Sequence, residues 1–143
     1  MAIAVKRVYE PVSRADGARI LVDRLWPRGL TKEKAALDDW LRGLSPSDDL
    51  RKWFHARPTQ WQDFRKRYLK ELAAPEAEEE LQKLYSLTRK KKRVTLLYAS
   101  RNETHNNAVA LKELLDGMRK PPTGTGPGAL RTARRRDAAI RGR

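Results

Sequence analysis

The sequence predicts a single-domain α/β fold, in which a small, mostly parallel sheet of about three or four strands is covered by helices. Two short β-rich runs lie near the start of the chain, at residues 3–8 and 18–22. Amphipathic stretches with helical spacing occupy most of residues 31–88. A third apolar run, residues 94–99, precedes a polar loop and another amphipathic stretch, and this order of strand, loop and helix is typical of α/β domains.

A turn separates the first two expected strands. Residues 13–17 end in Asp16-Gly17, and glycine readily takes the positive φ that many turns need. The connection is longer than a tight hairpin, so the two strands can pair in either direction.

Two helices are expected next. Thr31 is a suitable N-cap for a helix that reaches Gly43, with an apolar face formed by Ala36, Leu37, Trp40, Leu41 and Leu44. Ser45 as N-cap and Pro46 at the first helical position then predict a short helix that carries His55 near its C-terminal end.

Two further helices, a strand and a final helix complete the expected domain. Apolar residues at three- and four-residue spacing predict a helix from about residue 59, and Pro75 separates it from another. Residues 94–99 are too short for a helix and suit a central strand. Thr104 or Asn106 can cap the last helix.

The chain is strongly basic, with a formal net charge of +14. Residues 121–143 carry six arginines against one aspartate and are otherwise rich in Pro, Gly, Thr and Ala. We therefore expect an α/β domain at residues 1–120 and a flexible basic tail at residues 121–143. Nucleic acid, phosphorylated small molecules and acidic partners all fit this charge, and so does a role in solubility alone.

Several classes of site are excluded or disfavoured. The chain has no cysteine, which excludes disulfides, thiolate nucleophiles and thiolate metal sites. Its two histidines have no acidic cluster nearby, so we expect no metal site. No apolar run approaches the roughly 20 residues that cross a bilayer, and the first residues lack a signal-peptide pattern. We expect a cytoplasmic protein without a membrane partner.

The ends of the expected strands bring polar and aromatic residues together. Ligands of open parallel sheets bind beyond the carboxyl ends of the strands. Here those ends are residues 7–9, 23–29 and 98–102, and the last is followed by the start of a helix. The ligand-binding residues expected from these segments are Arg7, Tyr9, Arg24, Trp26, Arg28, Tyr98, Arg101, Asn102 and Asn106.

The four arginines of this set, Arg7, Arg24, Arg28 and Arg101, indicate an anion site. Guanidinium groups match the oxygens of phosphate and carboxylate groups, and a helix N-terminus adds free backbone N–H groups. Asp23 lies among them in sequence, so we expect the arginines to lower its pKa. Its predicted role is to position an arginine or to accept a proton.

These residues also have purely structural interpretations. Asp23 can pair with an arginine while Trp26 packs in the core and Gly29 turns the chain. His55 is a candidate acid–base catalyst together with Asp23, since imidazole exchanges protons near neutral pH, but it also suits the negative end of a helix dipole. The basic run at residues 89–93 is either a solvated helix end or a patch that contacts phosphate.

Two further groups have alternative roles. His105 and its neighbouring asparagines either contact a ligand or cap a helix. The helical spacing of the tryptophans favours the core over a partner surface for Trp40, Trp53 and Trp61.

Four segments carry a resemblance to a known family: residues 6–9, 19–29, 50–55 and 95–107. On these segments the chain resembles the YeaO-like family of small bacterial proteins of unknown function, over roughly residues 1–118. The resemblance implies an α/β domain and a characteristic Phe-His pair, which places His55 in the same pocket as Asp23. It implies no reaction, cofactor or catalytic residue.

Two functions follow as hypotheses. The first is a protein whose basic crevice at the strand ends binds an anionic small molecule such as a phosphate, a nucleotide or a carboxylate, with Asp23 and His55 as candidate catalytic groups if it is an enzyme. The alternative is a nucleic-acid-binding or regulatory protein that uses the basic face and the tail without catalysis. The sequence identifies no cofactor and no oligomeric state.

Overall fold

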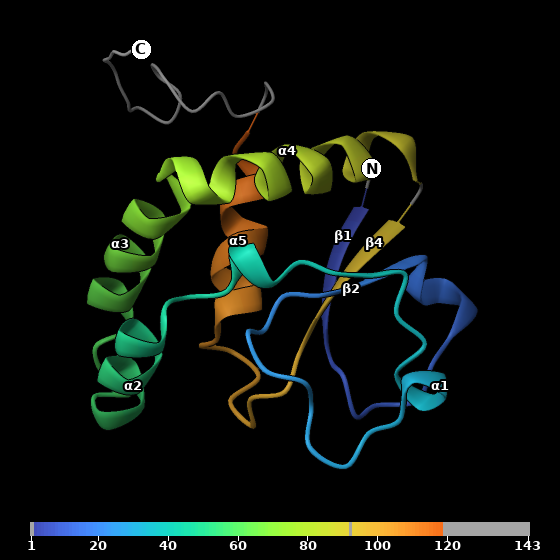
Figure 1. The fold of residues 1–143 in the computed structure, drawn as a ribbon, viewed down its shortest axis with the longest axis horizontal. Coiled ribbons are helices and arrows are strands. Elements are labelled where there is room, and N and C mark those ends of the chain that lie inside the picture. The colour runs from blue at the N-terminus through green and yellow to red at the C-terminus, as the bar shows by residue number, and fades with distance from the viewer. Residues whose placement is uncertain (1, 92, 119–143) are drawn as a thin grey trace.

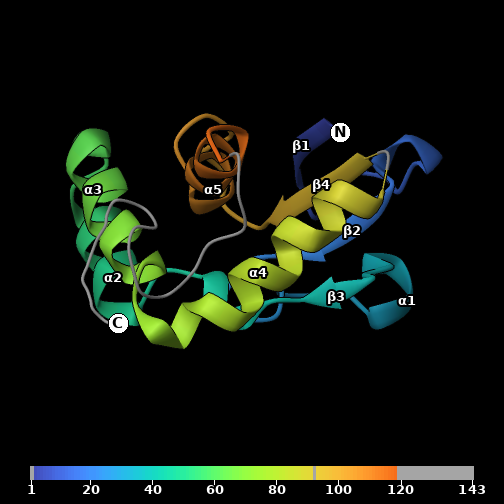
Figure 2. The ribbon, with the colours of Figure 1, turned by 90° about the horizontal axis from the view of Figure 1, so that it is seen from above.

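The computed structural model describes residues 2–91 and 93–118, and it confirms the predicted α/β class. Within these residues one sheet has the strand order β1-β4-β2-β3, and every pairing is parallel. Figure 1 shows β1, β4 and β2, and Figure 2 also labels β3. Its strands are β1 (Ala2–Arg7), β2 (Ala18–Leu21), β3 (Asp39–Trp40) and β4 (Arg93–Tyr98). The parallel direction of β1 and β2, which their sequence left open, follows from their shared neighbour β4.

The same part of the chain forms five α-helices and two short 3₁₀ helices. They are η1 (Arg14–Asp16), α1 (Lys32–Ala35), η2 (Arg42–Leu44), α2 (Asp48–Ala56), α3 (Trp61–Leu72), α4 (Pro75–Lys90) and α5 (Asn107–Asp116). Figure 2 shows α4 and α5 beside the sheet, with α2 and α3 beyond them. None of these helices is long and apolar enough to cross a membrane.

The main core lies between the sheet and the long helices. Alternate residues of the inner strands point to this face, and Ile20 and Leu96 are fully buried there against Leu84 of α4 and Leu111 of α5. Buried, β-branched and leucine-rich strands are what a parallel sheet requires, since both of its faces are covered. The core therefore fixes α4 and α5 on one side of the sheet.

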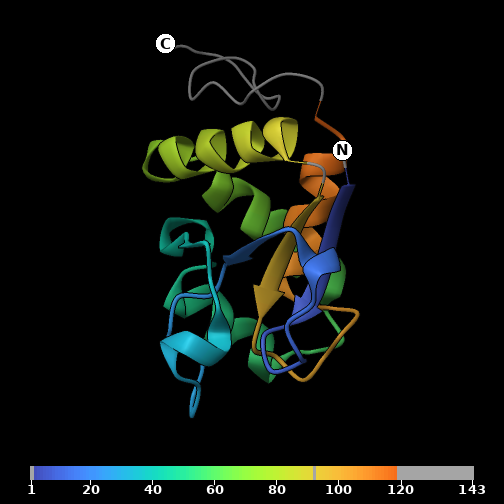
Figure 3. The same cartoon turned by 90° about the vertical axis from the view of Figure 1, so that its right-hand side faces the viewer.

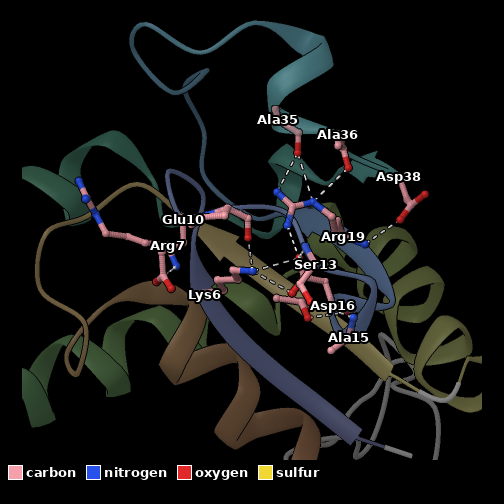
Figure 4. A network of polar contacts seen from close by, with 12 residues as sticks. Lys6, Arg7, Glu10, Ser13, Ala15, Asp16, Arg19, Ala35, Ala36 and Asp38 are labelled. Atoms are coloured by element: carbon pink, nitrogen blue, oxygen red, sulfur yellow. Dashed lines mark hydrogen bonds and ion pairs between the residues drawn. The ribbon is translucent and has the colours of Figure 1, made fainter.

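The opposite face of the sheet is partly polar. Leu21 and Leu97 form a small second core with Trp26 and Trp40, which come from the chain that follows β2. Beside it lies a buried ion network around Asp16 (Figure 4). Its carboxylate accepts hydrogen bonds from Lys6 Nζ at 3.0 Å and Arg19 Nη1 at 2.5 Å.

Arg19 connects this network to α1. Its guanidinium group also donates to the carbonyl oxygens of Ala35 at 2.8 Å and Ala36 at 3.1 Å (Figure 4). Burial acts to raise the pKa of Asp16, but hydrogen bonds from Lys6, Ser13 and Arg19 outweigh burial and hold the pKa below its usual value. The network is a structural support for this face.

The helix predicted from Thr31 to Gly43 is wrong. After the single turn of α1, Ala36 takes a left-handed conformation with φ 49°, and the chain becomes strand β3. The backbone N–H groups of Asp38 and Leu41 donate to the carbonyls of Arg19 and Leu21 in β2. The N–H groups of Asp38 and Leu41 therefore pair with β2, and the carbonyl groups of Ala35 and Ala36 accept from Arg19, so these backbone groups are not used for the hydrogen bonds of a longer helix.

The predicted cap of the next helix is displaced by two residues. Ser47, not Ser45, caps α2, and its Oγ accepts from Leu50 N at 3.1 Å. Glu71 of α3 fixes this cap by accepting from the backbone N–H and the hydroxyl of Ser47. Pro46 consequently precedes the helix. At the last helix the prediction is confirmed, because Asn106 caps α5 and its Oδ1 accepts from Val109 N at 2.9 Å.

All strands of the sheet run in the same direction, so their carboxyl ends lie along one edge of the sheet and their amino ends along the opposite edge. Figure 3 shows the loops that follow β1, β2 and β4 gathered at one edge and α4 crossing the other. We call these the carboxyl edge and the amino edge. The tail predicted at residues 121–143 lies outside the described residues.

Candidate functional site

A cleft of about 720 Å³ opens at the carboxyl edge. It is lined by loops that leave β1, β2 and β4, by α2 and by the start of α5. Ligand sites of open parallel sheets occur at this edge. The structure brings together there all but two of the residues that the sequence predicted: Tyr9, Asp23, Arg24, Trp26, Arg28, His55, Arg101, Asn102 and Asn106.

Asp23 holds the wall of this cleft together. One carboxylate oxygen accepts from the backbone N–H of Ala99, just after β4, at 2.9 Å. The other accepts from Asn107 Nδ2, at the start of α5, at 3.1 Å. The carbonyl oxygen of Asp23 accepts from Trp40 Nε1 at 2.7 Å. Asp23 therefore joins the end of β2 to three other elements.

The expectation that arginines lower the pKa of Asp23 is wrong. Burial raises the pKa of this carboxyl group above its usual value, although the hydrogen bonds from Ala99 and Asn107 and the charge of Arg51 act in the opposite direction. The donors that contact the carboxylate are neutral amides, so they offset the cost of burial only in part. Arg24 and Arg28 form no ion pair with Asp23.

The loop between β4 and α5 is shaped by asparagines. Asn102 Oδ1 accepts from the backbone N–H groups of Thr104 and His105, and its carbonyl oxygen accepts from Asn106 Nδ2. Asn106 is buried, and its Oδ1 accepts from the backbone N–H of Val109 at 2.9 Å. These two asparagines thus organise the loop, which is the capping role that the sequence allowed as an alternative.

Arg7 and Tyr98, the two remaining predicted residues, do not line the cleft. Tyr98 is buried in the main core. Arg7 donates through Nε to the carbonyl of Ser100 at 3.0 Å and stacks its guanidinium group on the ring of Tyr9. Tyr9 Oη in turn donates to the carbonyl of Arg28 at 2.9 Å. Arg7 therefore contacts the loop after β4 and the ring of Tyr9, which lines the cleft, without lining the cleft itself.

Trp26 closes the side of the cleft next to β3. Its Nε1 donates to the carbonyl of Leu30 at 2.6 Å, and its ring meets that of Trp40 edge-on at 5.4 Å between centroids. Gly29, at φ +78°, provides the turn between these contacts, in a conformation that side chains disfavour. Leu25, by contrast, points outward and is 62% exposed at the rim.

The cleft contains more positive than negative charge. Asp23 is the only carboxylate among the described residues that line it. Arg51 also lines it but pairs with Asp48 at 3.2 Å. In the described part of the chain Arg24, Arg28 and Arg101 have no carboxylate partner, and the one hydrogen bond of their guanidinium groups is a long one from Arg24 to the carbonyl of Pro46.

The wall formed by α2 and α3 is aromatic. Phe54 and Phe64 line the cleft and stack on each other at 4.4 Å between centroids. His105 lies flat on Trp61 at 4.6 Å. His55 also lines the cleft, but its exposed imidazole makes no hydrogen bond to the described residues. Arginines and aromatic rings therefore face one space from different elements.

Sequence reasoning missed Arg51 and Phe54 as cleft residues. A signal existed for Arg51, because it lies four residues before His55 and thus on the same face of α2. Asn107, which the sequence allowed as a ligand contact, does line the cleft, but no local pattern predicted that its side-chain amide donates to the carbonyl of Val22 at 2.9 Å.

Comparison with known proteins places the chain in a family. Residues 2–123 match the family DUF488-N3i, whose description reads "Inactive DUF488-N3 subclade". The chain belongs to the DUF488-N3i family. The uncharacterized protein YeaO of Escherichia coli K12 is 47% identical over 118 residues, which are 82% of this chain and 100% of YeaO. The YeaO-like resemblance is thereby confirmed.

Other similar proteins come from mycobacteria. The uncharacterized protein Rv3073c of Mycobacterium tuberculosis H37Rv is 37% identical over 115 residues, covering 80% of this chain and 94% of that protein. The uncharacterized protein Mb3100c of Mycobacterium bovis matches to the same extent. No solved structure matches the chain.

Proposed function

We propose that the carboxyl-edge cleft binds a small molecule that carries a phosphate or carboxylate group. The observation that supports this most is the convergence of Arg24, Arg28 and Arg101 on one cleft without a carboxylate partner in the described residues. Like charges held near one another raise the free energy of a fold unless a counter-ion binds. An anionic ligand provides that counter-ion.

The lining favours an anion that also has an apolar or planar part. Phe54 and Phe64 supply an aromatic wall, and Leu25 and Tyr9 stay 62% and 39% exposed at the rim. Ligand sites commonly combine an apolar lining with a few polar groups that fix orientation. A nucleotide or an aromatic acid meets both requirements better than free phosphate does.

We propose binding without catalysis. Both carboxylate oxygens of Asp23 already accept hydrogen bonds that join β2 to the chain after β4 and to α5. No described residue orients the imidazole of His55, although an acid–base group works best when a second group positions it. The description of the family as inactive agrees with this proposal.

The proposal is tested by thermal unfolding of the full chain with and without pyrophosphate and adenosine monophosphate. A ligand at about ten times its Kd stabilises the fold by about 1.4 kcal/mol, which corresponds to a rise in Tm of about 4 °C. We expect this rise in the unchanged protein. The variant Arg28→Gln/Arg101→Gln is expected to lose it, because it removes two of the unpaired guanidinium groups.

The control changes the same amount of charge elsewhere. Lys32→Gln/Lys34→Gln neutralises two exposed side chains on α1, which do not line the cleft. This variant is expected to keep the full rise in Tm. Equal losses in both variants, or no rise in the unchanged protein with either probe, contradict an anion site at the carboxyl edge.

Nucleic-acid binding, the alternative predicted from the sequence, finds less support at this cleft. Its arginines share the cleft with the rings of Phe54 and Phe64, which suit a ligand with a planar part, whereas contact with the phosphates of a nucleic-acid backbone uses no aromatic wall. A small anion suits the carboxyl edge better.

A further inference from the structure

A second basic cleft, of about 970 Å³, lies at the amino edge of the sheet. It is formed by η1, the end of α4 and the start of β4. It lies at the N-terminal end of β2, whereas the first cleft lies beyond the C-terminal end of β2. Its charged residues are Arg14, Asp38, Asp39, Lys83, Lys90, Lys91 and Arg93. None of these residues belongs to the carboxyl-edge cleft.

The two acidic residues of this cleft offset only part of its positive charge. Asp39 pairs with Lys83 at 2.8 Å, and Asp38 accepts a hydrogen bond from the backbone N–H of Arg19 at 2.7 Å. The remaining cations of the cleft have no ion-pair partner within the described residues. These cations are Arg14, Lys90, Lys91 and Arg93. The amino-edge cleft therefore carries uncompensated positive charge from three separate elements.

Helix stability accounts for two of these cations. Lys90 lies in the last turn of α4 and Lys91 is its C-cap residue, and a positive charge at either position is favoured by the helix dipole. Arg93 and Arg14 lie outside that helix. Their side chains are exposed, so the core does not require them either.

The backbone holds two of these cations close together. Gly17 has φ +65°, and a Cβ atom at this position would lie 2.2 Å from the carbonyl oxygen of Arg93. Only glycine permits this approach, which brings η1 and its Arg14 against the first residue of β4. The fold thus assembles four cations that form no ion pair within the described chain, against the single negative charge of Asp38.

We propose that the amino-edge cleft binds consecutive phosphate groups of a nucleic-acid duplex, without reading its base sequence. Two of its four unpaired cations are lysines, which are flexible point charges without the fixed geometry of a guanidinium fork. Its described lining contains no aromatic ring on which a base can stack, and stacking is what single-strand binders commonly use. Phosphate contact with a duplex needs neither feature.

The direction of the chain favours an extended polyanion over a single phosphate. α5 begins at the carboxyl-edge cleft and packs along β1 and β4, so its end at Asp116 lies toward the amino edge (Figure 3). The sequence that follows contains six arginines against one aspartate after residue 120. The last described turn of α5 therefore lies on the same side of the sheet as the amino-edge cleft.

Fluorescence anisotropy with the full chain tests this proposal. Two labelled duplexes of about 20 base pairs and unrelated sequence are titrated at several salt concentrations. The variant Arg14→Gln/Lys91→Gln/Arg93→Gln is compared with the control Lys32→Gln/Lys34→Gln/Lys66→Gln, which removes the same charge from exposed residues outside the cleft. Thermal unfolding of each variant confirms that the fold is intact.

We expect both duplexes to bind the unchanged protein equally. In the amino-edge variant the Kd is expected to rise about tenfold or more, and the slope of log K against log salt to fall by about 2–3, since each phosphate contact contributes about 0.9. The control is expected to keep the slope of the unchanged protein. The same loss in both variants indicates general charge attraction and overturns the site, as does a failure of the unchanged protein to bind duplex.

Discussion

One aspartate precedes β2 and another follows it, and the pKa values of these two carboxyl groups are shifted in opposite directions. Asp16 lies before β2 at the amino-edge side, and Asp23 follows β2 at the carboxyl edge. Burial acts to raise the pKa of both carboxyl groups, yet the pKa of Asp16 is lowered and that of Asp23 is raised. The difference lies in their donors.

Asp16 is bonded by the cationic groups of Lys6 and Arg19, whereas Asp23 is bonded by the backbone amide of Ala99 and the side-chain amide of Asn107. Charged donors stabilise a carboxylate more strongly than neutral ones. The cations next to Asp16 are therefore paired within the fold, while Arg24 and Arg28 near Asp23 form no ion pair in the described residues. The same residue type neutralises buried cations at one end of β2 and joins neighbouring elements through neutral donors at the other.

The largest expected effect is that of Asp16→Asn. Removing this charge leaves the buried Arg19 and the partly buried Lys6 without a counter-charge, so the free energy of unfolding is expected to fall by about 3–5 kcal/mol. Chemical denaturation measures the change. The matched control is Asp116→Asn, which breaks the exposed pair with Lys112 and is expected to cost at most about 1 kcal/mol. Equal losses in the two variants would mean that the buried network adds nothing.

A smaller loss is expected for Asp23→Asn. Asparagine keeps the shape of the side chain but replaces one acceptor with a donor, so either Ala99 N or Asn107 Nδ2 loses its partner. The expected loss in the free energy of unfolding is about 1–3 kcal/mol. Hydrogen exchange of the backbone N–H of Ala99 and of the side-chain amide of Asn107, followed by NMR, shows which of the two groups has lost its partner. Unchanged protection of both groups contradicts the positioning role of Asp23.

The two aspartates also predict opposite responses to acid. The lowered pKa of Asp16 means that its stabilising contribution is complete above the unfolded-state value of about 3.9 and is lost as pH falls through the folded-state pKa. The raised pKa of Asp23 means that the cost of burying its charge is relieved as pH falls through its folded-state pKa toward about 3.9.

Denaturation curves between about pH 7 and pH 4 separate these two contributions. As pH falls across this range, the unchanged protein is expected to gain stability relative to Asp23→Asn, because only the unchanged protein has a buried charge to neutralise. Its stability relative to Asp16→Asn is expected to stay constant until pH falls below about 3.9. Parallel curves for the unchanged protein and Asp23→Asn would contradict the raised pKa.

The parts of the fold that the sequence predicted well are those fixed by local signals. The apolar strand at residues 93–98 and the Asn106 cap are examples, since burial pattern and capping chemistry are local. The chain at residues 36–41 was not predictable in this way. Its apolar residues have helical spacing, but the N–H groups of Asp38 and Leu41 pair with β2, which lies far away in sequence.

The same distinction holds for the site. Parallel strand ends bring Arg24, Arg28 and Arg101 to one edge, so the location of the cleft followed from topology. The hydrogen-bond partner of each side chain did not follow from the topology. Arg7 turned away to the carbonyl of Ser100, and Asp23 acquired neutral donors in place of arginines, because both outcomes depend on the path of loops that no local pattern encodes.

The smallest expected effect is that of His55→Gln, and it separates binding from catalysis at the carboxyl edge. His55 is exposed and makes no hydrogen bond to the described residues, so its replacement is expected to change the free energy of unfolding by less than about 0.5 kcal/mol. The rise in Tm with pyrophosphate is expected to persist, since Arg28 and Arg101 remain. A complete loss of that rise would assign the imidazole a direct contact with the anion and restore His55 as a candidate for acid–base chemistry beside Asp23.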